Sequence, residues 1–126
     1  MGQKLASEVD DYITDACPGT LLGRLSFVGH SLGGVIIRAA LPYLNQYSGK
    51  MHLLLTLSTP HLGTKHNDSW QVKAGFWFIK TFNKKATSLK QISMDDAKNP
   101  RETFLYNLSQ EKGIGWFKHV VLLGSS

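Results

Sequence analysis

Cysteine is almost absent from this chain: Cys17 is the one cysteine among 126 residues, so no internal disulfide can form. Disulfide-stabilised secreted scaffolds are thereby excluded, and a reducing compartment is favoured. No apolar run approaches the roughly 18 residues that a membrane-spanning helix needs. The polar start, residues 1–6, lacks the features of a signal peptide. These absences predict a cytoplasmic protein, with peripheral association with a membrane left open.

Proline is also scarce, with four residues, and the twelve glycines follow no repeat, which excludes collagen-like and low-complexity chains. The chain has no Cys-x-x-Cys or His-Glu-x-x-His pattern, no phosphate-binding loop and no dinucleotide fingerprint, so we expect no metal and no cofactor. What remains is 42% apolar and 18% charged, enough to bury the core of one domain. The 14 basic and 9 acidic residues give a net charge of +5, which weakly favours anionic surfaces.

Hydrophobic periodicity predicts alternating helices and strands. Apolar positions at spacings of three and four indicate a helix over residues 3–16. Short apolar runs predict three buried strands, near 25–28, 52–58 and 118–124. A second helix is expected to start at Leu32 and to end near Leu41, because Pro42 cannot continue it. Strands that alternate with helices indicate an α/β sheet of parallel strands, the middle one pairing with both others.

Two later segments carry weaker signals. Asn99, Pro100 and Glu102 occupy the cap, first and third positions of a typical helix start. Gly113 is expected to end that helix. Residues 64–98 mix aromatic side chains with lysines, and we interpret them as a cap or lid over an acyl pocket, with the lysines at an anionic lipid surface. A core-facing helix with a solvated lysine face explains the same pattern equally well. No nucleic-acid-binding module is recognisable.

The strongest chemical signal lies between the first predicted strand and its helix, at Gly29-His30-Ser31-Leu32-Gly33-Gly34. The pattern is typical of a nucleophile elbow, in which a serine on a tight strand-to-helix turn exposes its hydroxyl in a strained conformation. Gly29 and Gly33 are expected because a Cβ at either position would collide across the turn. The Leu32 N–H, at the helix N-terminus, can donate to a developing oxyanion. Ser31 is the predicted nucleophile; the alternative is a glycine-rich turn that only packs tightly.

The general base and its orienting acid are harder to place. His30 precedes the serine and is expected to point away from it, so it is not the expected base. In this architecture the acid follows the serine along the chain and the histidine comes last. After the second predicted strand the first carboxylate is Asp68, and no histidine follows the third strand. Residues 1–126 therefore cannot complete a triad in the usual order. The alternative to an enzyme is a catalytically incomplete fragment or pseudoenzyme that acts as a structural or interaction module.

Several stretches together resemble one family, in the same order along the chain: LSFVGHSLGGVIIRAAL, LLTLSTPHLGTKHNDS, GFWFIK, NPRETFLYNLS and FKHVVLLGSS. The chain resembles the lipase-like serine esterases of the α/β-hydrolase superfamily, such as the C-terminal domain of the large eukaryotic proteins called "family with sequence similarity". The resemblance implies a single partial α/β-hydrolase domain over residues 1–126, with helices on both faces of the sheet and a cap-like insertion. It also implies Ser31 as nucleophile and the Leu32 N–H as half of the oxyanion hole.

The function that this resemblance implies is hydrolysis of carboxylic esters, of the kind met in lipid metabolism, through an acyl-enzyme on Ser31. A lipid or another small ester is the expected partner, and nucleic acid is not. The expected lining of the substrate pocket is His30, His61, Phe76 and Trp77. His61 follows the second predicted strand, where loops over such sheets form sites. Alternatively, its ring only bonds the backbone of a tight turn.

Overall fold

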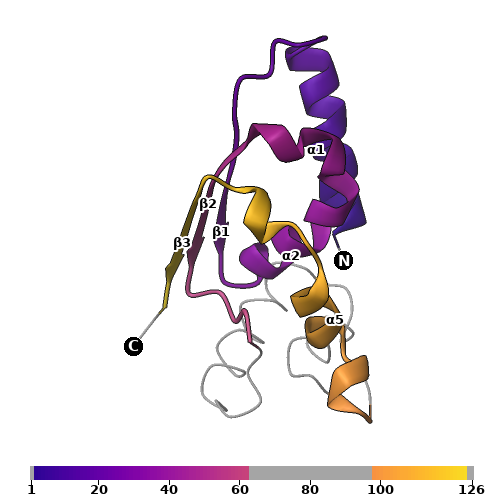
Figure 1. Cartoon of the computed structure of the whole chain (residues 1–126), viewed down its shortest axis with the longest axis vertical. Coiled ribbons are helices and arrows are strands. Elements are labelled where there is room, and N and C mark those ends of the chain that lie inside the picture. Colours follow the sequence, from indigo (N-terminus) through magenta and orange to yellow (C-terminus); the bar gives the residue numbers. More distant parts are fainter. Residues whose placement is uncertain (1, 63–97, 125–126) are drawn as a thin grey trace, which may run out of the picture. The chain divides into compact units, whose positions relative to one another are not determined.

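The computed structural model describes residues 2–62 and 98–124. The chain divides into two compact units: unit 1 comprises Met1–Thr59 and Glu111–Ser126, and unit 2 comprises Pro60–Gln110. The described elements of unit 1, labelled in part in Figure 1, are α1 (Gln3–Ala16), β1 (Leu25–His30), α2 (Leu32–Ala40), η1 (Leu41–Lys50), β2 (Met51–Leu57), η3 (Ile114–Trp116) and β3 (His119–Leu123). Those of unit 2 are η2 (Pro100–Glu102) and α5 (Phe104–Gln110), where η denotes a 3-10 helix.

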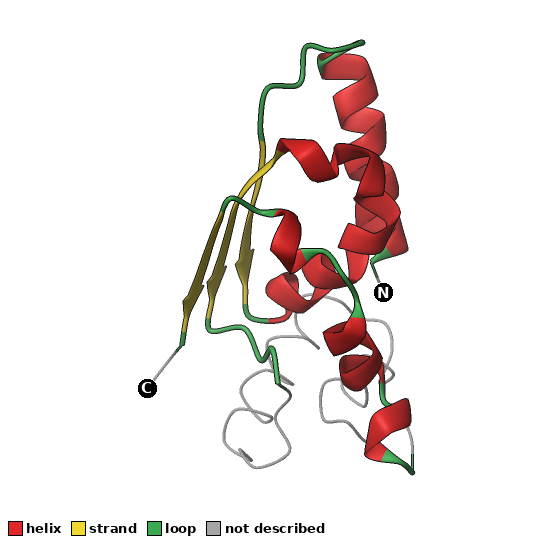
Figure 2. Ribbon diagram, viewed as in Figure 1, coloured by secondary structure: helices red, strands yellow, loops and turns green. Residues whose placement is uncertain are grey.

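The strands of unit 1 form one parallel sheet in the order β1-β2-β3 (Figure 2). Phe27 pairs with Leu54 across the first ladder, and Leu55 pairs with Val121 across the second. The predicted strands, their direction and the pairing of the middle strand with both others are confirmed. Because the strands are parallel, their carboxyl ends lie along one edge of the sheet. We call this the carboxyl edge and the opposite one the amino edge.

The core of unit 1 lies on one face of this sheet. Phe27 of β1 is buried there, whereas its neighbours Ser26 and Val28 are exposed on the other face. The Phe27 ring meets Phe117 edge-to-face, with ring centroids 6.1 Å apart. The remaining buried members of this core come from α1, α2, η1 and β2: Ala6, Ile37, Ala40, Leu41, Leu44, Met51 and Leu54. Helices were expected on both faces; in the described part of unit 1, α1 and α2 lie over the Phe27 face (Figure 1).

Two strands are less buried than predicted. Val28 of β1 is 65% exposed, and every residue of β3 is exposed, Leu122 and Leu123 each by 52%. The prediction of a buried strand is therefore wrong for β3 and holds for one face of β1. The physical reason is position: β3 pairs with β2 alone, and no described element of unit 1 covers the face that carries Val28. The central strand β2, by contrast, buries Leu54 almost completely.

The helix boundaries of unit 1 follow the sequence signals closely. α1 spans the predicted residues 3–16, and α2 begins at Leu32, as predicted. α2 ends at Ala40 and the chain continues as η1, because Pro42 has no N–H to extend an α-helix. Of the helices that the structure describes, none combines the length and the apolar character that crossing a membrane requires.

In unit 2 the predicted helix start is confirmed only as a short turn. The Asn99 side chain accepts a hydrogen bond from the Arg101 N–H at 3.0 Å, as a cap does, but η2 ends after one turn. α5 begins after Thr103, whose hydroxyl accepts a hydrogen bond from the Tyr106 N–H at 3.4 Å. The prediction of a single helix starting at Pro100 is therefore wrong. The segment forms the short η2 and then a separate helix, α5, which the buried Thr103 caps. The expected cap segment, 64–98, falls almost wholly outside the described residues.

Candidate active site

Ser31 is the single residue between the end of β1 and the start of α2. Its backbone has φ 52° and ψ −126°, a combination that is strained for a residue with a side chain. The Ser31 N–H donates to the Leu57 carbonyl at 2.8 Å, which ties this turn to the end of β2. The half-buried side chain makes no capping hydrogen bond to α2. The serine is thus fixed at the carboxyl edge by backbone contacts, while its hydroxyl is not used as a helix cap.

Close packing explains Gly29 and Gly34 of the motif, whereas Gly29 and Gly33 were expected. A Cβ on Gly29 would lie 2.8 Å from Gly34 Cα and from Ile37 Cδ1, so the predicted collision is confirmed there. A Cβ on Gly33 would meet no described atom within 4 Å, so the same prediction is wrong for Gly33. The second position that has no space for a side chain is Gly34, where a Cβ would lie 2.3 Å from Thr59 Oγ1. The turn is therefore tight against the strand before it and against the end of β2.

The N-terminus of α2 lies directly after Ser31. Leu32 is the first residue of α2, so its N–H has no acceptor within the helix. Its side chain is only 4% exposed, which fixes the orientation of this peptide. The helix dipole adds partial positive charge at the same place. This position is compatible with the predicted role of the Leu32 N–H as a donor to an oxyanion, which stays a prediction.

A second strained serine, missed by the sequence analysis, ends the neighbouring strand. Ser58 has φ 50°, and its N–H donates to the Leu123 carbonyl at 2.7 Å. The next residue, Thr59, packs against Gly34, and its buried Oγ1 has no hydrogen-bond partner among the described residues. The signal that points to these residues is the small polar pair Ser58-Thr59 directly after an apolar strand. Through Thr59, the end of β2 packs against the start of α2.

Two further histidines of unit 1 lie at the amino edge, away from Ser31. His52 and His119, near the starts of β2 and β3, meet edge-to-face with ring centroids 5.2 Å apart. The pKa of His52 is lowered, mainly by partial burial. Neighbouring positive charges, first that of Arg24, lower it further. At about 3.3 Å per strand residue, both rings are roughly 15–20 Å from Ser31 along the sheet. Neither histidine can take a proton from the Ser31 hydroxyl.

A family model agrees with this serine-centred arrangement. The model described as "Putative serine esterase (DUF676)" matches residues 1–126. The chain belongs to this family. The predicted resemblance to lipase-like serine esterases is thereby confirmed at the level of the family. No solved structure matches the chain.

The structure treats the four predicted pocket residues differently. His30 ends β1 and is exposed. His61 is half-buried and belongs to unit 2, so the structure does not relate it to Ser31. Phe76 and Trp77 lie outside the described residues. The roles assigned to these four side chains, to the Ser31 hydroxyl and to the Leu32 N–H stay predictions.

Proposed function

We propose that this serine esterase is a lipase-like hydrolase of carboxylic esters that works through an acyl-enzyme on Ser31. The observation that carries the proposal is the backbone of Ser31, with φ 52° and ψ −126° at the junction of a parallel strand and a helix. Strain of this kind persists where the surrounding structure over-determines it, and it clusters at functional sites. Gly29 and Gly34 supply the space that the turn requires. These observations support the proposal that the turn at Ser31 is a nucleophile elbow.

The proposed chemistry has two steps that meet at Ser31. The Ser31 Oγ attacks the ester carbonyl carbon while its proton passes to a general base, and the carbonyl oxygen becomes an oxyanion that accepts from the Leu32 N–H. When the oxyanion collapses, the bond to the alcohol breaks, and the alcohol leaves with the proton from the base. Water then attacks the acyl-enzyme in the same way and releases a carboxylic acid and the free serine. The base and its orienting acid, in this proposal, are residues outside the described ones.

Lipid esters are the substrate class that we propose. The net charge of +5 favours approach to anionic lipid surfaces, and a peripheral contact of a cytoplasmic protein with such a surface is part of the proposal. Segment 64–98 would supply the cap, with Phe76 and Trp77 beside the acyl chain. His30 and His61 would line the rest of the pocket. The enzyme would then act in lipid metabolism.

A second candidate is a catalytically incomplete module that acts by binding. One observation favours it: in the described part of unit 1, the carboxylates are on α1 and at Glu111, and His52 and His119 lie at the amino edge. His30 is next to Ser31 in the chain, but it ends β1 with an exposed side chain, and none of these carboxylates is on the β1–α2 turn to orient it as a base. The exposed strands β1 and β3 would be the interaction surface of such a module.

Covalent labelling distinguishes the two candidates. A fluorophosphonate reacts with a serine Oγ that a base activates, so in the full natural protein we expect one equivalent of label on Ser31. Mass spectrometry of the labelled peptide locates the serine. Ser31→Ala should abolish labelling, whereas Ser58→Ala should retain it, although Ser58 also follows a strand and has positive φ. A folded protein whose Ser31 stays unlabelled contradicts the hydrolase and supports the binding module.

A further inference from the structure

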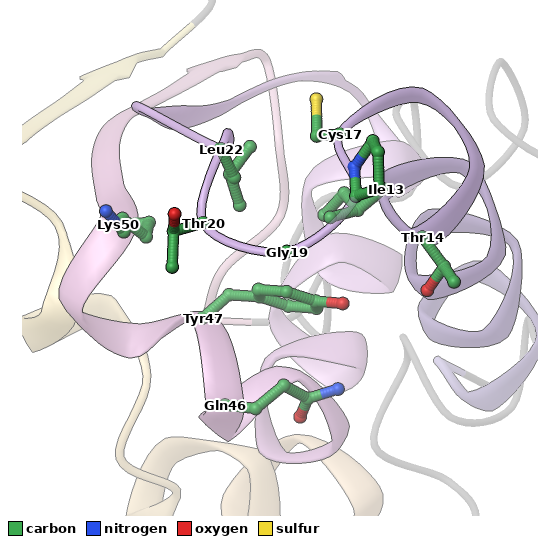
Figure 3. A pocket seen from close by; sticks show the side chains of 10 residues that line it. Ile13, Thr14, Cys17, Gly19, Thr20, Leu22, Gln46, Tyr47 and Lys50 are labelled. Carbon is green, nitrogen blue, oxygen red and sulfur yellow. The ribbon is translucent and has the colours of Figure 1, made fainter.

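Unit 1 contains a cavity that is separate from the Ser31 turn. It has a volume of about 390 Å³ and lies between the end of α1, the loop at residues 17–22 and the end of η1 (Figure 3). Lys50, in its lining, directly precedes β2, and Leu22 lies shortly before β1, so the cavity opens at the amino edge. The length of β1 separates it from Ser31 by roughly 20 Å. A volume of this size falls within the range of small-molecule sites.

One wall of this cavity is fixed by a hydrogen-bond network centred on Asp10 of α1. The Tyr47 hydroxyl donates to Asp10 Oδ1, and Gln46 Nε2 donates to the same oxygen at 3.2 Å. The hydrogen bond to Asp10 is the main cause of a raised pKa of Tyr47. The Thr14 hydroxyl donates to the Asp10 carbonyl at 2.8 Å. The wall is therefore in place before any ligand arrives, which lowers the entropic cost of binding.

The lining of the cavity divides by chemistry. Lys50 is the one charged side chain among its described lining residues, and Figure 3 shows it at the same end as the Thr20 hydroxyl. Ile13 and Leu22 provide apolar surface, which Figure 3 shows above the Tyr47 ring. One ammonium group with a neighbouring hydroxyl suits a single negative charge, whereas a phosphate dianion would require more cations. Thr14 and Gln46 are the other polar side chains of the lining, and the surface of Ile13, Leu22 and the Tyr47 ring suits an alkyl chain.

We propose that this cavity is a second binding site, for an amphiphile with one carboxylate and an unbranched alkyl chain. The carboxylate would pair with the Lys50 ammonium and accept from the Thr20 hydroxyl, and the alkyl chain would lie against Ile13, Leu22 and the Tyr47 ring. The assignment stands on the cavity and does not depend on hydrolysis at Ser31. If Ser31 does hydrolyse esters, the carboxylic acid product has the same chemistry as this ligand. The site would then bind product at the edge of the sheet away from Ser31.

The chain provides its own reporter for this site, because Cys17 lines the cavity and is its one cysteine. We would follow the rate of Cys17 alkylation by N-ethylmaleimide, by intact mass, with three probes of equal chain length: octanoate, octan-1-ol and octylammonium. Saturating octanoate should slow alkylation at least fivefold, octan-1-ol less, and octylammonium not at all. Ser31→Ala should leave this pattern unchanged, which separates the test from the proposed hydrolysis.

Variants at Lys50 test whether its positive charge causes the preference for octanoate over octan-1-ol. Lys50→Gln should give octanoate and octan-1-ol the same effect, whereas Lys50→Arg should preserve the preference for octanoate. Lys112→Gln, at an exposed lysine outside the cavity, is the matched control and should behave as the wild type. Circular dichroism confirms that each variant is folded. No protection by octanoate, equal protection by all three probes, or a preference that survives Lys50→Gln in folded protein would each overturn the proposal.

Discussion

Ser31 and Ser58 occupy equivalent places at the ends of neighbouring strands, and they differ in the element that comes next along the chain. Both have positive φ, 52° and 50°, and each N–H donates to a carbonyl of the next strand, at 2.8 and 2.7 Å. Ser31 is followed at once by the nine-residue helix α2, whereas Ser58 leads to Thr59 and Pro60 without a described helix. Positive φ alone therefore does not distinguish the two serines. The helix that follows does, and in the proposed mechanism its N-terminus supplies the donor for the oxyanion at Ser31.

The largest expected effect is on the rate of ester hydrolysis, and it distinguishes Ser31 from Ser58. In the full natural protein, Ser31→Ala should lower kcat/KM for p-nitrophenyl octanoate by at least about 10³-fold, because the acyl-enzyme can no longer form. Ser58→Ala should change it by only a few fold, since that side chain has no proposed role in the reaction. Initial-rate measurements on both variants provide the test. Equal losses in the two would mean that the edge, and not the elbow at Ser31, determines activity.

A smaller effect concerns stability, and the glycines provide matched variants. Gly29→Ala and Gly34→Ala should each lower the free energy of unfolding by about 1–3 kcal/mol, because the added methyl group has no space. Gly33→Ala should be neutral or stabilising by up to about 1 kcal/mol, because alanine favours the helix and its Cβ meets no described atom. Urea denaturation measures all three. A Gly33→Ala variant as unstable as the other two would show that the described turn is wrong.

The smallest expected effect tests the strain itself. Glycine adopts positive φ without cost, so Ser58→Gly should raise the free energy of unfolding by about 0.5–1 kcal/mol. Ser31→Gly should stabilise by a similar amount while abolishing hydrolysis. The same urea experiment, together with an activity assay, checks both. If both variants destabilise the protein, the positive φ values are not a source of strain.

The sequence predicted those features whose signals are local. The strand, Ser31 and the start of α2 are encoded within the few residues around Gly29, and Pro42 marks the end of α2 within two residues. The fold class can be inferred from the alternation of such signals. The nucleophile is predicted in the same way, from a motif that is contiguous in the chain.

The features that could not be predicted depend on contacts between distant residues. Gly34, and not Gly33, is the crowded position because Thr59 arrives from the end of β2. The exposure of β3 depends on what covers the sheet, which an apolar run of five residues does not encode. The wall of the amino-edge cavity depends on Asp10 meeting Tyr47 from another helix. Each of these required the fold before it could be seen.

The hydrogen bonds at the carboxyl edge also form a mechanical linkage. The carbonyl of Leu123, at the end of β3, accepts a hydrogen bond from the Ser58 N–H. The carbonyl of Leu57, directly before Ser58, accepts one from the Ser31 N–H. The outermost strand is thus connected to the Ser31 turn through two hydrogen bonds and one peptide unit. Because β3 is exposed along its whole length, a molecule that docked on it and displaced its end would act on the Ser58 N–H and, through the same peptide unit, on the carbonyl that holds the Ser31 N–H. These two hydrogen bonds are the route by which a contact on β3 would reach the serine turn.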